Sequence, residues 1–73
     1  MNWDGCEFVE RVDGRCAGAP TVVGTRVFPD TIVDAYLHGM SVEEIRDDYP
    51  SVSTEKIQAL IRFAERVRAK SAA

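Results

Sequence analysis

The sequence contains little of what small catalytic or metal-binding proteins are built from. Its 73 residues include two cysteines, one histidine and one tryptophan. No apolar run approaches the roughly 20 residues that cross a bilayer, and the first residues lack the basic segment and apolar core of a secretory signal. We therefore expect a cytoplasmic protein without a membrane segment, in which Cys6 and Cys16 remain thiols.

The scarcity of histidine and cysteine also argues against metal and catalytic sites. His38, Cys6 and Cys16 lack the paired close spacing of zinc ligands, and the glycines match neither the dinucleotide-binding nor the phosphate-binding loop pattern. His38 stands beside Gly39 at the expected end of a helix, where a histidine more often supports the helix than transfers protons. We expect no enzyme, no metal and no cofactor.

Positive charge is scarce overall but concentrated at one end. The net charge is −3, yet residues 61–73 hold four cations and one carboxylate, whereas residues 1–60 hold 5 cations and 11 carboxylates. Modules that bind nucleic acid through bulk charge are usually strongly basic, so the total charge argues against that mode of binding. The basic end either stabilises a helix dipole or docks on an acidic partner, because guanidinium groups bind carboxylates as readily as phosphates.

A chain of this length forms only a small hydrophobic core by itself. A domain of this size buries only about 60% of the surface that its unfolded chain exposes, and we expect a homodimer to supply the rest. Residues 1–73 form one domain, in which residues 7–27 are rich in β-branched and aromatic side chains. They predict two paired strands, 7–12 and 21–27, with a turn at Asp13-Gly14 and a bulge or close backbone approach at Gly24.

Residues 30–69 predict a trihelical unit. Pro29-Asp30 supplies a turn and a cap for the first helix, which Gly39 ends. Ser41 and Glu44 fit a capping box at the start of a helix over about 42–48, and a third helix opens at Ser53 and continues to about Arg68. The expected apolar stripes are Ile32, Val33, Tyr36 and Leu37 on the first helix, and Ile57, Leu60, Ile61, Ala64 and Val67 on the third. The predicted fold class is α+β and mainly helical: a short N-terminal β-ribbon followed by a three-helix unit.

The second and third helices have the lengths of a helix-turn-helix, whose second helix presents its first residues to bases in the major groove. The DNA-binding candidates on the third helix are Thr54, Lys56, Gln58 and Arg62. Glutamine and arginine are the side chains that read adenine and guanine with paired hydrogen bonds. The alternative is a solvated helix face. Four carboxylates on the preceding helix, Glu43, Glu44, Asp47 and Asp48, favour it because they would repel phosphates.

Three segments of the chain form a specific pattern: Gly18-Ala19-Pro20-Thr21-Val22-Val23-Gly24-Thr25-Arg26-Val27, then Gly39-Met40-Ser41-Val42-Glu43-Glu44-Ile45, then Asp48-Tyr49-Pro50. In this order and spacing they are similar to domain-of-unknown-function family 433. The resemblance covers about residues 6–65, with Gly18-Ala19 where members typically have Gly-Gly. It implies a homodimeric, ribbon-bearing helix-turn-helix protein of the VapB antitoxin type, encoded beside a PIN-like ribonuclease toxin that it neutralises. Such antitoxins commonly also repress their own operon.

The structural motif of this resemblance is Gly24, Thr25 and Arg26. We interpret Arg26 as one half of a buried or interfacial ion pair with Asp30 or Asp34, and give a partner-binding role less weight.

The leading hypothesis is an antitoxin-like dimer that binds a PIN-like toxin and, through its helix-turn-helix, its operator DNA. The partner-binding candidates are Phe63, Arg66, Arg68 and Lys70. Phe63 lies off the apolar stripe, so it either offers an exposed contact or completes the core. Two alternatives remain open: a stand-alone DNA-binding transcriptional regulator, and a protein interaction module that binds no DNA.

Overall fold

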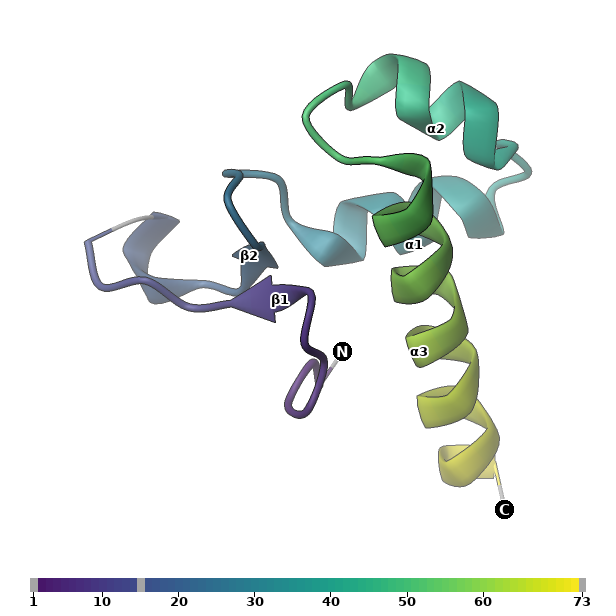
Figure 1. The fold of residues 1–73 in the computed structure, drawn as a ribbon. Helices are drawn as coiled ribbons and strands as arrows, with labels where there is room; N and C mark the ends of the chain where they lie inside the picture. The colour runs from purple at the N-terminus through teal and green to yellow at the C-terminus, as the bar shows by residue number, and fades with distance from the viewer. Residues whose placement is uncertain (1, 15, 73) are drawn as a thin grey trace.

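The computed structural model describes residues 2–14 and 16–72, and for residues 16 and 70–72 it describes the backbone alone. The elements are β1 (Val9–Glu10), the 3₁₀ turn η1 (Cys16–Gly18), β2 (Thr21–Val22), α1 (Pro29–Leu37), α2 (Val42–Asp48) and α3 (Thr54–Ala72). The two strands form an antiparallel ribbon on one side of the helices (Figure 1). The predicted mainly helical α+β fold, with a ribbon followed by three helices, is confirmed.

The ribbon is shorter than its sequence predicts. Val9 lies opposite Val22 and Glu10 opposite Thr21, and the pairing covers only these residues. β2 ends early because the chain turns back at Gly24, whose φ of +77° suits glycine. The Thr25 amide donates to the Val22 carbonyl over 2.9 Å. Gly24 therefore forms a tight turn and not the expected bulge within a longer strand. The alternative of a close backbone approach is wrong too, since a Cβ added at Gly24 would meet no described atom within 4 Å beyond its chain neighbours.

The ends of α1 are built from the residues around Pro29 and Gly39. Phe28 occupies the cap position without a side-chain hydrogen bond, and Pro29 follows at the first helical position, where its missing amide costs nothing. The prediction that Asp30 caps the helix is wrong, because Asp30 lies inside the first turn. At the other end, Gly39 has a φ of +100° and its amide donates to the Tyr36 carbonyl over 3.0 Å, as in a Schellman motif.

Side-chain caps set the starts of α2 and α3. The Glu44 amide donates to the Ser41 hydroxyl over 3.2 Å, and the Ser41 amide donates to the Glu44 carboxylate over 3.1 Å, which confirms the capping box and the predicted 42–48 helix. The Ser53 hydroxyl accepts the Lys56 amide over 3.2 Å at the start of α3. α3 continues to Ala72, beyond the expected end near Arg68.

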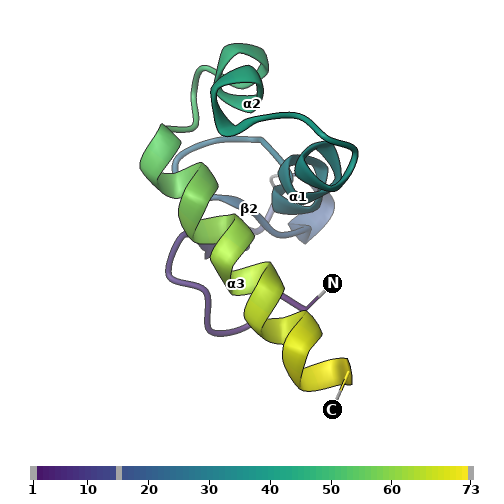
Figure 2. The same ribbon diagram turned by 90° about the vertical axis from the view of Figure 1, so that its right-hand side faces the viewer.

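The core lies where α3 packs against α1 and α2. Its buried apolar side chains are Trp3, Val22, Ile32, Val33, Ile45, Val52, Ile57, Leu60, Ile61 and Ala64. The predicted stripe of α3 is thus confirmed, with Val67 half-buried at its end. The C-terminal half of α3 continues past α1 and α2 in both views (Figures 1 and 2).

The stripe predicted for α1 is wrong in its last turn. Tyr36 is 38% exposed and Leu37 54% exposed, and Phe28, just before the helix, is 44% exposed. These three residues, which we call the α1 patch, are the exposed large apolar side chains of the described residues. The core extends along α1 only as far as the other two helices cover it, and its last turn lies beyond that cover.

Candidate functional site

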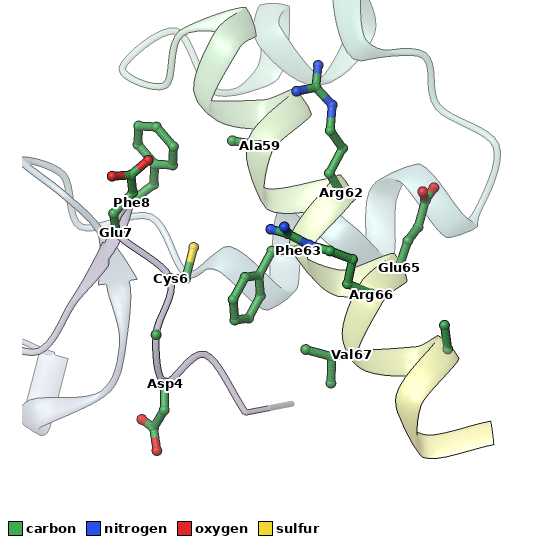
Figure 3. A pocket seen from close by; sticks show the side chains of 12 residues that line it. Asp4, Cys6, Glu7, Phe8, Ala59, Arg62, Phe63, Glu65, Arg66 and Val67 are labelled. Carbon is green, nitrogen blue, oxygen red and sulfur yellow. The ribbon is translucent and has the colours of Figure 1, made fainter. Parts of the chain in front are cut away.

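An open groove separates the N-terminal segment from the C-terminal half of α3. Its volume is about 1010 Å³. From α3 it is lined by Ala59, Arg62, Phe63, Glu65, Arg66, Val67 and Ala69, and from the N-terminal segment by Asp4, Gly5, Cys6, Glu7 and Phe8. Figure 3 shows the two walls facing each other, with the Phe63 ring directed into the space between them. We call this feature the α3 groove.

Trp3 fixes one wall of the α3 groove to the helices. Its ring stacks on that of Phe63, with centroids 5.5 Å apart and planes inclined by 18°. Its indole N–H donates to the Asp30 carboxylate, 2.9 Å away, at the start of α1. The Trp3 side chain is only 3% exposed. Trp3 thereby holds the segment that follows it, residues 4–8, at a fixed place opposite α3.

The two walls carry mainly opposite charges around an apolar centre. The α3 wall also contains one carboxylate, Glu65, which is directed away from the N-terminal segment (Figure 3). Arg62 and Arg66 are exposed and lie one turn apart on α3, and the guanidinium carbon of Arg66 is 5.8 Å from the centre of the Phe63 ring. This cation–π contact holds the charge of Arg66 beside the groove. Asp4 and Glu7 are exposed on the opposite wall. The groove therefore offers an amphipathic surface with a basic and an acidic border.

The structure brings together only part of the predicted partner-binding set. Phe63 and Arg66 line the α3 groove, joined by Arg62 from the DNA-binding set. Phe63 is half-buried, so it both completes the core and faces the groove. Arg68 is exposed, but at two residues beyond Arg66 it projects about 200° further around the helix. The side chain of Lys70 lies outside the described residues.

Of the DNA-binding candidates, three lie on one exposed face of α3 and the fourth does not. Thr54, Gln58 and Arg62 are all exposed and follow one another at intervals of four residues along α3. Lys56 is half-buried, and its ammonium group lies 3.5 Å from the Val23 carbonyl, so it points toward the ribbon. The four carboxylates of α2, Glu43, Glu44, Asp47 and Asp48, are exposed. Since α2 lies beside the first turns of α3 (Figure 1), the candidate DNA-contacting face is bordered by negative charge.

The motif Gly24, Thr25 and Arg26 shapes the loop after β2. The Gly24 amide donates to the Glu10 carboxylate over 3.0 Å. The Thr25 hydroxyl donates to the Val22 carbonyl over 2.9 Å and accepts the Val27 amide over 3.1 Å. Arg26 is exposed, so the predicted buried ion pair is wrong, because no packed element covers this loop position. An interfacial ion pair would require a second chain.

Other polar residues have structural roles. The Nδ1 atom of His38 lies 2.7 Å from the Asp34 carbonyl, which confirms that this histidine supports the end of α1. Cys6 carries a free thiol, half-buried in the groove wall, and the side chain of Cys16 lies outside the described residues. Within residues 2–14 and 16–72, no group of three potential metal ligands converges, and no described helix has the length and hydropathy of a membrane span.

The sequence prediction missed the N-terminal wall of the groove. Residues 4–6 show neither helical nor strand periodicity, and the strand predicted for residues 7–12 does not indicate that Glu7 and Phe8 face α3. The available signal was Trp3, a large apolar side chain outside every predicted element, which needs a partner to bury it. A search for that partner among the residues off the α3 stripe leads to Phe63.

Comparisons with known proteins bear on the fold and the family. No curated protein matches the chain. The crystal structure of a DUF433 member protein from Anabaena variabilis ATCC 29413 has a TM-score of 0.67 and 22% sequence identity, a level that supports the fold alone. The match covers 86% of this chain but 62% of that protein. The family model described as "Protein of unknown function (DUF433)" matches residues 9–64, so the chain belongs to the DUF433 family.

Proposed function

We propose that the protein is the antitoxin-like component of a type II toxin–antitoxin pair, a homodimer that neutralises a PIN-like nuclease by direct contact. The observation that carries the proposal is the basic wall of the α3 groove. There Arg62 and Arg66 stand exposed beside the apolar ring of Phe63, on a helix that continues past the core. An interface centre of this kind, with arginine next to an aromatic ring, is typical of residues that dominate protein–protein binding.

The chemistry of arginine suggests how binding would inhibit such an enzyme. PIN-like nucleases are expected to hold their metal ions with carboxylates, and a guanidinium group forms paired hydrogen bonds with a carboxylate. Arg62 and Arg66 are close enough along α3 to act on the same acidic centre. Their charge would compete with the metal ions, and the body of the small protein would block access of RNA.

A nuclease encoded beside this chain provides the test. Its cleavage of RNA is measured against increasing concentrations of the wild-type protein, R62A/R66A and R11A/R46A. Both variants remove two positive charges at exposed arginines, but only the first alters the groove wall. We expect R62A/R66A to weaken inhibition by about tenfold or more and R11A/R46A to change it far less. Equal inhibition by R62A/R66A and the wild-type protein would refute the role of the groove wall, and an uninhibited nuclease would refute the antitoxin role.

Operator binding is a second candidate activity, favoured by the exposed line of Thr54, Gln58 and Arg62. The carboxylates of α2 beside that line weaken the attraction for phosphates, so we propose that the partner nuclease supplies the missing affinity. The test is an electrophoretic shift of the DNA upstream of the gene, with and without the nuclease. We expect T54A/Q58A, which spares the groove, to abolish the shift. A strong, salt-dependent shift by the isolated protein would instead indicate a stand-alone regulator.

A further inference from the structure

We infer that the α3 groove binds an amphipathic α-helix of the partner protein, with carboxylates along the helix edge that faces Arg62 and Arg66. The inference rests on the proposed function only in taking the occupant to be a protein. It adds the secondary structure and the charge pattern of the segment that binds.

The open shape of the groove favours a chain segment over a small molecule. Sites for small ligands are concave and bury most of the surface of the ligand, whereas this groove is open to solvent. Its apolar lining, Phe8, Phe63 and Val67, is contributed by both walls. A helix lying between the walls would bury its apolar stripe on these side chains, as helices do in the grooves of other binding proteins.

The N-terminal wall is unsuited to the addition of a β-strand. A strand adds to a free, regular sheet edge, but β1 comprises only Val9–Glu10. Before it the backbone turns on itself: the Cys6 amide donates to the Trp3 carbonyl over 3.1 Å, and the Val9 amide donates to the Cys6 carbonyl over 3.3 Å. These amides are already used within the wall. An occupant that satisfies its own backbone, a helix, fits this surface better.

The charges of the two walls predict which charges the edges of the bound helix carry. Within the part of the chain that the structure describes, no ion pair joins Arg62 or Arg66 to Asp4 or Glu7. All four charges are therefore available to an occupant, and carboxylates on one edge of the helix would meet the arginines. Asp4 and Glu7 favour cations on its other edge and would repel the phosphates of a nucleic acid. The contact of Arg66 with Phe63 already restrains one guanidinium group, which reduces the entropy lost on binding.

The groove contains its own spectroscopic reporter. Trp3 is the single tryptophan of the chain and stacks on Phe63, which lines the groove. A helix packed on Phe63 would change the surroundings of this ring pair. A change in Trp3 emission is therefore the expected sign that a peptide without tryptophan occupies the groove.

The test uses a displayed library of 14-residue helical peptides, selected on the full-length protein. Enriched peptides are titrated against the wild-type protein, R62E/R66E and R11E/R46E, the last being a matched charge reversal at two exposed arginines outside the groove. Circular dichroism checks that all three proteins are folded. We expect enriched peptides to combine an apolar stripe with an acidic edge, to change the Trp3 emission, and to bind R62E/R66E at least about tenfold more weakly. R11E/R46E should bind them within about twofold of the wild-type affinity.

A charge swap completes the test. Replacement of the acidic edge of the best peptide by lysine should restore binding to R62E/R66E and abolish binding to the wild-type protein. The inference is overturned if no helical peptide is enriched, or if the enriched peptides bind R62E/R66E as tightly as the wild-type protein. Neither result involves the nuclease. The groove can therefore fail this test while inhibition of the nuclease persists, or pass it while the antitoxin role fails.

Discussion

Trp3 connects three parts of the chain through one side chain. It is buried, it stacks on Phe63 of α3, and its indole N–H is bonded to Asp30 of α1. We predict that W3A lowers the free energy of unfolding by about 3–5 kcal/mol, the usual cost of truncating a buried aromatic ring. Urea unfolding followed by circular dichroism measures this change without relying on tryptophan emission.

The variant W3F tests how much of this loss a single aromatic ring at position 3 recovers. It keeps a ring against Phe63 but removes the N–H donor to Asp30 and part of the buried indole, so we expect a loss of about 1–3 kcal/mol. If W3A unfolds within about 0.5 kcal/mol of the wild-type protein, the N-terminal segment does not hold the position that the structure gives it. In that case the groove would lose one of its walls.

The sequence did not predict this anchor, because its contacts are long-range. Trp3 lies 27 residues from Asp30, and neither residue belongs to a periodic pattern that would link them. Arg26 shows the same limit: its charge suggested an ion pair, but whether that position is covered depends on the path of the loop. In contrast, the contact of His38 with the Asp34 carbonyl spans a single helical turn, and the supporting role of His38 at the helix end was predicted from sequence, although its partner was not.

At the scale of elements, the loop after β2 is held by the side chain of Thr25. Its hydroxyl donates to the Val22 carbonyl and accepts the Val27 amide. We predict that T25A lowers the free energy of unfolding by about 1–2 kcal/mol, since two hydrogen bonds of a part-buried hydroxyl are lost together. T25S keeps the hydroxyl and should lose much less, and thermal unfolding compares the two variants.

Arg26 is the matched control for this loop. It is exposed and directly follows Thr25, so R26A should change the unfolding free energy by no more than about 0.5 kcal/mol. Equal losses in T25A and R26A would show that the loop is not stabilised by the threonine hydroxyl. A partner-binding defect of R26A at unchanged stability would assign this residue to an interface.

Helix boundaries were predictable where their determinants are close in sequence. The capping box of Ser41 and Glu44 spans four residues, and the prediction of α2 was correct at both ends. Strand length was not predictable, because β2 ends where Gly24 and Thr25 redirect the chain, although the β-branched residues continue. Periodicity likewise identified the apolar face of α1 but not how much of it the rest of the chain covers.

At the scale of the whole molecule, the acidic and basic residues that are separated along the sequence also lie on separate parts of the surface. The carboxylates of α2 border the first turns of α3. Arg62 and Arg66 lie further along α3, where they border the groove. A surface that faces phosphates and a surface that faces a protein can thus occupy different parts of one helix. Arg62 belongs to both, so binding of a partner at the groove and of DNA at the start of α3 would be coupled through it.

The exposed last turn of α1 is the surface that we expect to meet a second copy of the chain. Tyr36 and Leu37 lie there, whereas Phe28, nine residues before Leu37, projects about 180° away around the helix axis. A twofold axis beside the last turn would pack Tyr36 and Leu37 against their counterparts. A chain of 73 residues also buries only about 60% of the surface that its unfolded form exposes. We predict that light scattering gives twice the chain mass of 8.1 kDa.

The substitution L37E tests the location of this interface. A carboxylate in an apolar contact must be desolvated, so we expect L37E to yield monomers at concentrations where the wild-type protein is dimeric. Q58E adds the same charge at an exposed position of α3 and should leave the dimer intact. A wild-type mass of one chain at every concentration would contradict the dimer, and an L37E protein that remains dimeric would place the interface away from α1. If L37E is monomeric and folded, its inhibition of the nuclease shows whether one copy of the groove is enough.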